Sequence, residues 1–200
     1  MTSINNNLIF SAKTINQEQL LQTAKLIYSA LPDFYNLFFA SFSIEEVYEV
    51  ITNQINSKDA ELEETHIYKD ANDDIVVGAY SFYQTSESTS RQFMGMKKFY
   101  RKINLEKIDE VEQNLAKFSK NIPKITDDGS YLARFAVDHN FQGKGIANAL
   151  MEDFIKQSNA HAKCYLHVKK DNLRAINFYK KTGWGVSHDS LDYIIMCRNR

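Results

Sequence analysis

Two glycines flank a lysine within the hexapeptide Gln142 to Ala147 (Gln-Gly-Lys-Gly-Ile-Ala), which follows an apolar run and precedes a helical pattern. A strand, a glycine loop and a helix start form an anion site in this order. The free amides of the first helical turn point at the ligand, and the helix dipole favours negative charge there. Gly143 and Gly145 let the backbone approach a phosphate because no Cβ intervenes. The hexapeptide therefore predicts a pyrophosphate site.

Two common phosphate-binding loops match this hexapeptide poorly. A P-loop needs Ser or Thr directly after its Gly-Lys pair, whereas Gly145 follows Lys144 here. A dinucleotide-binding loop needs a third small residue where this chain has Asn148, and no acidic residue ends the next expected strand near Val168 to bind a ribose. The interpretation of this chain as a nucleotide-binding protein is therefore weak.

The hexapeptide resembles a signature of the GNAT superfamily of acyl-CoA-dependent N-acyltransferases, Arg/Gln-x-x-Gly-x-Gly/Ala. Two further blocks of that family agree with this chain in order and spacing. Ala-x-x-Ala-Val ends at Val137, and Asn-x-x-Ala-x-x-Phe-Tyr-x-Lys-x-Gly-Trp runs from Asn172 to Trp184, where the family usually has Phe at the last position. The resemblance covers about residues 129–186.

The resemblance implies an α/β fold: a twisted, mostly antiparallel sheet with a central pair of splayed parallel strands, flanked by helices. It also implies direct transfer of the acetyl group of acetyl-CoA to a primary amine of a small molecule or peptide, without a metal. The main alternative is a non-catalytic acyl-CoA-binding or regulatory module on the same fold, because fold does not fix activity. The sequence does not name the acceptor.

On this resemblance, the glycine loop would bind the pyrophosphate of coenzyme A through backbone amides. The expected ligands are Gln142, Gly143, Lys144, Gly145, Ile146 and Ala147. The pantetheine arm would add to the free edge of the preceding strand as an extra strand does. Its expected contacts are Phe135, Ala136 and Val137. Asn172 would cap the next helix, bind the pantetheine, or do both.

Tyr179 is the expected catalytic residue, and it is also expected to contact the cofactor. A phenol with a pKa of about 10 can protonate a departing coenzyme A thiolate. The alternative is a core tyrosine, because Ala175 and Tyr179 share a helical face. We assign no base: Glu61, Glu63 and Glu64 attract a cationic acceptor or form a solvated face, and a water chain would need no residue at all.

Three histidines have a suitable pKa for a base, His66, His139 and His167, but His139 follows the expected strand and lies near the pyrophosphate loop. Asp127 and Asp128 precede the central strand and are expected in a turn. Cys164 is expected to be buried and structural, because neither a helix start nor a base adjoins it. Cys197 is interpreted in the same way.

The elements that must position these residues follow from periodicity and turn signals. Ser43 and Glu46 are spaced as a capping box, and Pro32 is expected to end the first helix. Aromatic residues cluster at 34–42. We expect strands at 8–15, 61–68, 75–83, 131–137, 164–168, 184–186 and 193–197, and helices at 16–31, 43–55, 93–103, 105–118, 146–157 and 172–182.

Residues 85–128 interrupt this order and are predicted to be a helical insertion with a loop-like start at 85–90. The apolar positions Phe93, Met96, Phe99 and Tyr100 need a partner, so this segment is expected either to cover the acceptor as a lid or to extend the core. The acceptor is expected beside the aromatic cluster at 34–42. Four cations form a small basic patch that is interpreted as a solvated face: Lys97, Lys98, Arg101 and Lys102.

Composition sets the remaining bounds. Of 200 residues, 44% are hydrophobic and the net charge is −1, which suits a single domain, 1–200, and gives no overall field that would recruit nucleic acid or a membrane. Two cysteines are too few for a disulfide framework. No signal peptide or membrane span is visible, so we expect a cytoplasmic protein. We expect it to be a monomer or a homodimer.

Overall fold

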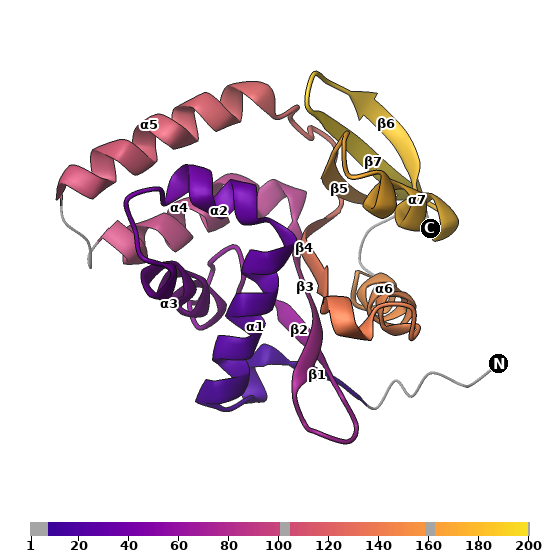
Figure 1. The fold of residues 1–200 in the computed structure, drawn as a ribbon. Coiled ribbons are helices and arrows are strands. Elements are labelled where there is room, and N and C mark those ends of the chain that lie inside the picture. Colours follow the sequence, from indigo (N-terminus) through magenta and orange to yellow (C-terminus); the bar gives the residue numbers. More distant parts are fainter. Residues whose placement is uncertain (1–7, 101–104, 159–162, 200) are drawn as a thin grey trace.

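The computed structural model of the chain describes residues 8–100, 105–158 and 163–199. In these ranges seven strands form one sheet in the order β1-β2-β3-β4-β5-β7-β6 (Figure 1). Neighbouring strands are antiparallel except for the central pair, β4 and β5. The strands are β1 (Ile9–Ser11), β2 (Thr65–Lys69), β3 (Val76–Gln84), β4 (Ser130–Val137), β5 (Lys163–Lys169), β6 (Gly185–Asp189) and β7 (Tyr193–Asn199).

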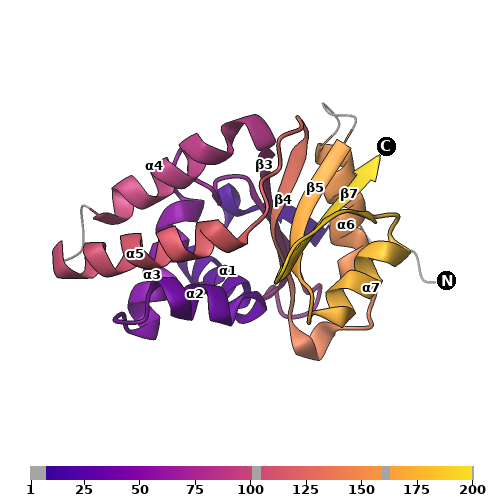
Figure 2. The same cartoon turned by 90° about the horizontal axis from the view of Figure 1, so that it is seen from above.

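Helices cover both faces of this sheet, as the view from above shows (Figure 2). One face carries α1 (Gln17–Ala30), α2 (Pro32–Phe38), α3 (Ile44–Ile55), α4 (Ser88–Tyr100) and α5 (Leu105–Asn121). The other carries α6 (Ile146–Gln157) and α7 (Leu173–Lys181). Two buried apolar cores result, one on each face. The mixed α/β fold with one parallel pair is the one that the sequence resemblance implied, and the structure confirms it.

The parallel pair separates soon after it starts. Only Ser130 and Tyr131 of β4 pair with β5, through Cys164 and Tyr165, although β4 continues to Val137. From Leu132 onward the edge of β4 that faces β5 therefore has no strand partner in the described part of the chain. We call this stretch, 132–137, the free edge of β4. The expected splay of the two strands is confirmed.

A β-bulge lies at the start of the free edge. Leu132 pairs with Phe82 and Arg134 pairs with Ser81, so Ala133 has no partner on β3. An extra residue of this kind reverses the alternation of side chains between the two faces. Leu132 accordingly joins the core under α6, whereas Ala136 joins the core under α1.

Local sequence explains where the helices on the first face begin. The predicted capping box at Ser43 and Glu46 is present, and Asn16 and Gln19 form a second one at α1. The prediction that Pro32 ends the first helix is confirmed, but a new helix, α2, begins at that same residue. Proline is tolerated at the first helical position because it needs no amide there.

Several predicted boundaries are wrong. β1 ends at Ser11 and a 3-10 turn, η2 (Ala12–Thr14), follows it, and β2 begins at Thr65, because 57–63 form successive turns closed by Ala60 and Glu63 amides. The expected loop at 85–90 is a 3-10 turn, η3 (Thr85–Glu87), followed by the start of α4. Glu87 supports this helix start by pairing with Arg91 at 2.7 Å.

The expected insertion contains α4 and α5. The helix predicted at 105–118 is confirmed and runs to Asn121, whereas the end of the helix predicted at 93–103 lies outside the described residues. So do the side chains of its expected apolar face and basic patch. Val111 on α5 is fully buried, and Leu115 and Phe118 pack against the core under α1. Within the described ranges, no helix is long and apolar enough to cross a membrane.

Candidate active site

The glycine loop connects β4 to α6 through a short 3-10 turn, η4 (His139–Phe141). Gly143 and Gly145 have φ of 80° and 84°, a left-handed conformation that disfavours any side chain. Gly145 is the N-cap of α6 and gives the first-turn amides no side-chain acceptor. A Cβ at Gly143 would meet no atom within 4 Å, so the outer side of the loop is open. These features suit an anion held by backbone amides.

The side chains of the loop turn back onto the protein. Gln142 donates its Nε2 to the carbonyl of Val137 at 3.4 Å, and the Lys144 ammonium lies 4.2 Å from the centre of the Phe141 ring. Ile146 is buried in the core under α6, and Ala147 is partly buried. The backbone is therefore the part of the loop that is presented outward.

The free edge of β4 faces α7. The Phe135 ring stacks on Phe178 with centroids 5.6 Å apart and meets Tyr179 at 6.3 Å. Ala136 is buried on the other face, and Val137 packs against the core under α6. Asn172 caps α7 as predicted, by accepting the Ala175 amide at 3.1 Å.

Tyr179 lies on the inner side of α7, with 8% of its surface exposed. Burial raises the pKa of its phenol well above the usual value, so the hydroxyl is protonated at neutral pH. Its ring lies against Phe135 of the free edge of β4, with centroids 6.3 Å apart, and against Trp184 at 5.9 Å.

Tyr131 begins a short hydrogen-bonded chain across the two strands. Its hydroxyl lies 2.9 Å from Nδ1 of His167 on β5, and Nε2 of His167 lies 2.7 Å from the carbonyl of Pro123. A carbonyl only accepts, so Nε2 carries the proton in the neutral ring and Nδ1 accepts from Tyr131. Burial lowers the pKa of His167, which keeps this ring neutral at pH 7. The neutral Nδ1 of His167 is therefore an acceptor for the Tyr131 proton.

Two of the three glutamates in the run 61–64 are not part of a solvated face. Glu61 forms an ion pair with Arg134 at 3.2 Å, with exposed side-chain fractions of 14% and 7%. Glu63 pairs with Lys13 and Arg91, and Glu64 pairs with Lys13. The interpretation as a solvated face is therefore wrong for Glu61 and Glu63.

The other residues considered as bases lie elsewhere. His139 is exposed beside the glycine loop. His66 stacks on Tyr80 at 5.0 Å and lies near Asp153 of α6, under the other face. Asp127 accepts from Lys163 and Tyr165 in the expected turn.

Cys164 is buried, as predicted, and Cys197 is partly buried. Among the described residues, no three His, Cys, Asp or Glu side chains are grouped as a metal site would need.

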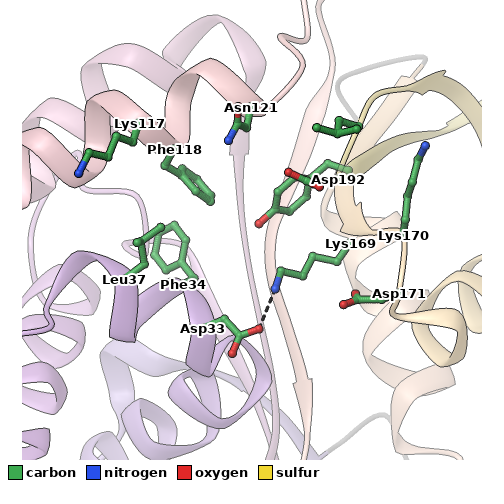
Figure 3. A pocket seen from close by; sticks show the side chains of 12 residues that line it. Asp33, Phe34, Leu37, Lys117, Phe118, Asn121, Lys169, Lys170, Asp171 and Asp192 are labelled. Atoms are coloured by element: carbon green, nitrogen blue, oxygen red, sulfur yellow. Dashed lines mark hydrogen bonds and ion pairs between the residues drawn. The ribbon is translucent and has the colours of Figure 1, made fainter.

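A pocket of about 470 Å³ opens on the face covered by α2 and α5. Figure 3 shows Lys169, at the end of β5, reaching across it to Asp33 of α2, with a separation of 2.7 Å. Phe34 and Phe118 face each other at one side with centroids 5.3 Å apart. Tyr193 of β7 lies against Phe118 at 6.0 Å.

The charges around the pocket are gathered near Tyr193. Burial is the largest effect that raises the pKa of this phenol, and Asp192, Asp33 and Asp171 add to it, while Lys169 opposes them. Asp33, Asp171 and Asp192 line the pocket together with Lys117, Lys169 and Lys170, so its wall carries both signs of charge.

Comparison of the sequence with known protein families identifies the family. A sequence model of the acetyltransferase (GNAT) family matches residues 28–184. The chain belongs to this family. The match includes all three sequence blocks and also α2 to α5, which the blocks themselves do not reach.

Solved acetyltransferases of this family share the fold. An N-acetyltransferase from Staphylococcus aureus is 19% identical, with a TM-score of 0.72 over 94% of this chain and 98% of that one. PaiA N-acetyltransferase from Thermoplasma acidophilum, in complex with coenzyme A, is 16% identical, with a TM-score of 0.53 over 96% and 98%. A chain of the NatC complex bound to Gag peptide and coenzyme A is 16% identical, with a TM-score of 0.55 over 96% and 97%. Among curated proteins, none matches the sequence significantly.

Sequence reasoning did not find Tyr131 and Arg134 as site residues, and it weighed Glu61 and His167 without assigning them. All four meet on the face of this GNAT sheet that carries α2 and α5. The bulge at Ala133 brings Tyr131 and Arg134 to one face of the sheet although three positions separate them. Knowing this bulge would have been necessary to group the two residues. A sequence does not show a bulge, because the pairing of β3 with β4 defines it.

Proposed function

We propose that this GNAT protein is an N-acetyltransferase that moves the acetyl group of acetyl-CoA directly to a primary amine. One observation carries the proposal: β4 continues into the glycine loop at one end of its free edge, contacts Tyr179 through Phe135, and carries the Tyr131–His167 pair at the other end. A donor held along that edge would bring its thioester to the point where β4 and β5 separate.

The donor would be held mainly by backbone. The amides of Gly143 to Ala147 would bind the pyrophosphate at the start of α6. The free edge of β4 at Phe135 to Val137 would pair with the pantetheine arm, with Phe178 and Asn172 beside it. Bound acetyl-CoA supplies the thioester whose carbonyl carbon accepts the amine and whose sulfur leaves. Chains of PaiA and NatC, solved with coenzyme A, support this choice of ligand.

The acceptor would enter through the pocket beside Tyr193. An alkyl amine with a pKa near 10 arrives as an ammonium, and the carboxylates of Asp171 and Asp192 would bind it, because Asp33 is already paired with Lys169. Lys117, Lys169 and Lys170 also line the pocket, so the ammonium would be bound by an individual carboxylate and not by a net negative charge. The aromatic wall of Phe34, Phe118 and Tyr193 would bind the apolar part of the same molecule. Small amines and peptide amines both satisfy this chemistry. Phe118 and Asn121 on α5 line the pocket, so the insertion would shape it as well as extend the core.

Tyr131 and His167 would prepare the amine. The Tyr131 hydroxyl accepts one ammonium proton as it donates its own to His167 Nδ1, and the resulting imidazolium keeps both hydrogen bonds. Tyr179 donates its proton to the departing sulfur, and the second proton lost by the nitrogen restores it. Burial holds the pKa of Tyr179 high, so it starts protonated.

The proposal is tested by measuring thiol release from acetyl-CoA with a panel of amines. We expect turnover with at least one amine and binding of coenzyme A, but not NAD, by calorimetry. Tyr179→Phe should lower kcat by about 10² to 10⁴ with little change in coenzyme A affinity. Tyr165→Phe is the matched control, because it also removes one phenol hydroxyl, and that hydroxyl bonds to Asp127 and takes no part in the proposed steps. Binding of coenzyme A without turnover of any amine would favour the non-catalytic module instead.

A further inference from the structure

Arg134 is a buried cation in the middle of the sheet. It follows the bulge of β4 directly, and 7% of its side chain is exposed. Burial alone would lower the pKa of the guanidinium, but Glu61 and Tyr35 outweigh this effect, so the group is charged. A buried charge of this kind destabilises the folded state unless it is paired and fully hydrogen-bonded. The mechanism described above gives Arg134 no chemical step.

The contacts of Arg134 join three parts of the molecule. Its NH1 donates to the carbonyl of Ala133 at 2.8 Å and to Glu61 at 3.2 Å, and its Nε donates to the Tyr35 hydroxyl at 3.3 Å. The guanidinium also lies 4.9 Å from the centre of the Phe34 ring. One planar group thus binds the bulge, the segment before β2, and helix α2, which is a geometry that Arg supports and Lys does not.

Arg134 holds the bulge residue itself. Ala133 has no register partner on β3, and its carbonyl accepts a hydrogen bond from Arg134 at 2.8 Å. The bulge also decides which side chains face which layer. Loss of the extra residue from the ladder would turn either Tyr131 or Phe135 to the opposite face. Tyr131 would then leave His167, or Phe135 would leave Phe178.

We infer that Arg134 is a positioning residue: with Glu61 it fixes the Ala133 bulge, and thereby both the free edge of β4 and the place of Tyr131. Through Tyr35 and Phe34 it also ties this strand to the wall of the pocket. The consequence for activity rests on the proposed function. The consequence for the bulge does not.

The test separates positioning from stability by replacing the whole ion pair. Arg134→Met alone leaves Glu61 buried without its partner and should destabilise the fold. Adding Glu61→Leu removes that charge, and apolar replacement of a buried pair commonly restores stability. We expect the double variant to unfold near the wild-type temperature, but to bind coenzyme A about tenfold more weakly and to lose about a hundredfold in kcat, by analogy with misplaced catalytic geometry.

The matched control is Arg91→Met with Glu63→Leu. Arg91 and Glu63 form an ion pair with side chains 13% and 15% exposed. Their other hydrogen-bond and ion-pair partners are Lys13, Asp59, Ala60 and Glu87, which all lie outside β4. This control should keep coenzyme A affinity and kcat. Arg134→Lys keeps the positive charge but not the planar guanidinium with its several donors, so it should give an intermediate loss of coenzyme A affinity and kcat. If the double variant does not fold, Arg134→Lys provides the test of the inference.

A readout without ligand distinguishes failure of this inference from failure of the proposed function. Amide hydrogen exchange at 132–135 should be faster in both Arg134 variants than in the wild type and the control. Unchanged exchange there, or a folded variant with wild-type coenzyme A affinity and kcat, would overturn the inference. If the wild type itself does not bind coenzyme A, the proposed function fails, and the exchange data alone decide the role of Arg134 at the bulge.

Discussion

The proposed donor site comes from one continuous stretch of chain, β4 to α7, whereas the pocket on the other face collects residues from α2, α5, the end of β5 and the turn before β7. The donor side uses backbone: positive φ at two glycines, uncapped amides and a strand edge. The pocket uses side chains, Asp33, Phe34, Phe118 and Tyr193 among them. Local backbone geometry leaves a motif in the sequence, and side chains gathered from afar do not.

The proposed relay of Tyr131 and His167 joins β4, which carries the donor edge, to β5, which ends at the pocket, and it should give the largest effect. His167→Gln keeps a donor for the Pro123 carbonyl but cannot take up a proton, so kcat should fall by about 10² to 10⁴ while coenzyme A affinity stays. Stopped-flow rates with calorimetry measure both quantities. His66→Gln is the control, because that histidine packs on Tyr80 under the other face. A full kcat in His167→Gln would remove the relay from the mechanism.

The glycine loop should respond next, and only in donor binding. Gly145→Ala forces a side chain into φ of 84°, which costs about 1–3 kcal/mol and should weaken coenzyme A binding about ten- to a hundredfold if the loop itself must shift. Gly183→Ala imposes the same strain at φ of 88° after α7. It should lose similar stability and keep its coenzyme A affinity. Equal affinities in the two variants would contradict a backbone donor site.

A substitution in the pocket wall should change the binding of the acceptor alone. Phe118→Ala removes a ring that contacts Phe34, Phe38 and Tyr193, so the KM of the best amine should rise up to about tenfold, as the loss of an aromatic contact of about 0.5–1.5 kcal/mol predicts. Coenzyme A affinity should not change. If coenzyme A affinity fell and KM for the amine did not, the assignment of the two regions would be reversed.

The smallest effect should be a shift in pH dependence. Burial lowers the pKa of His167, so the neutral ring that accepts a proton persists at lower pH than an ordinary histidine allows. The acidic limb of kcat/KM should therefore lie below about pH 6.5. It should disappear in His167→Gln, where activity is low throughout. An acidic limb at or above pH 6.5 in the wild type would indicate another titrating group.

The elements of the proposed donor site could be predicted from the sequence, because they are close together along the chain. The strand before the loop, the two glycines and the start of α6 lie within 28 consecutive residues, Ser130 to Gln157, and each has a local rule. Capping boxes at α3 and the Asn172 cap of α7 followed equally from residues three apart.

The features that could not be predicted depend on contacts between residues far apart in the sequence. Arg134 meets Glu61 across 73 positions and Tyr35 across 99, and the Ala133 bulge exists only in the register of β3 with β4. A run of glutamates usually forms a solvated face, so tertiary contact reversed the expectation for Glu61. The polar start of α4 was missed for a related reason, since Glu87 and Arg91 stabilise that helix without an apolar pattern.

The central claim is that backbone along β4 and the glycine loop holds the donor, while the side-chain pocket holds the acceptor. Amide NMR shifts during titration with coenzyme A test it most directly. We predict large shifts at Gly143 to Ala147 and at Phe135 and Val137, with little change at Phe118 and Asp192. Shifts confined to the pocket residues, or none at saturating coenzyme A, would contradict it.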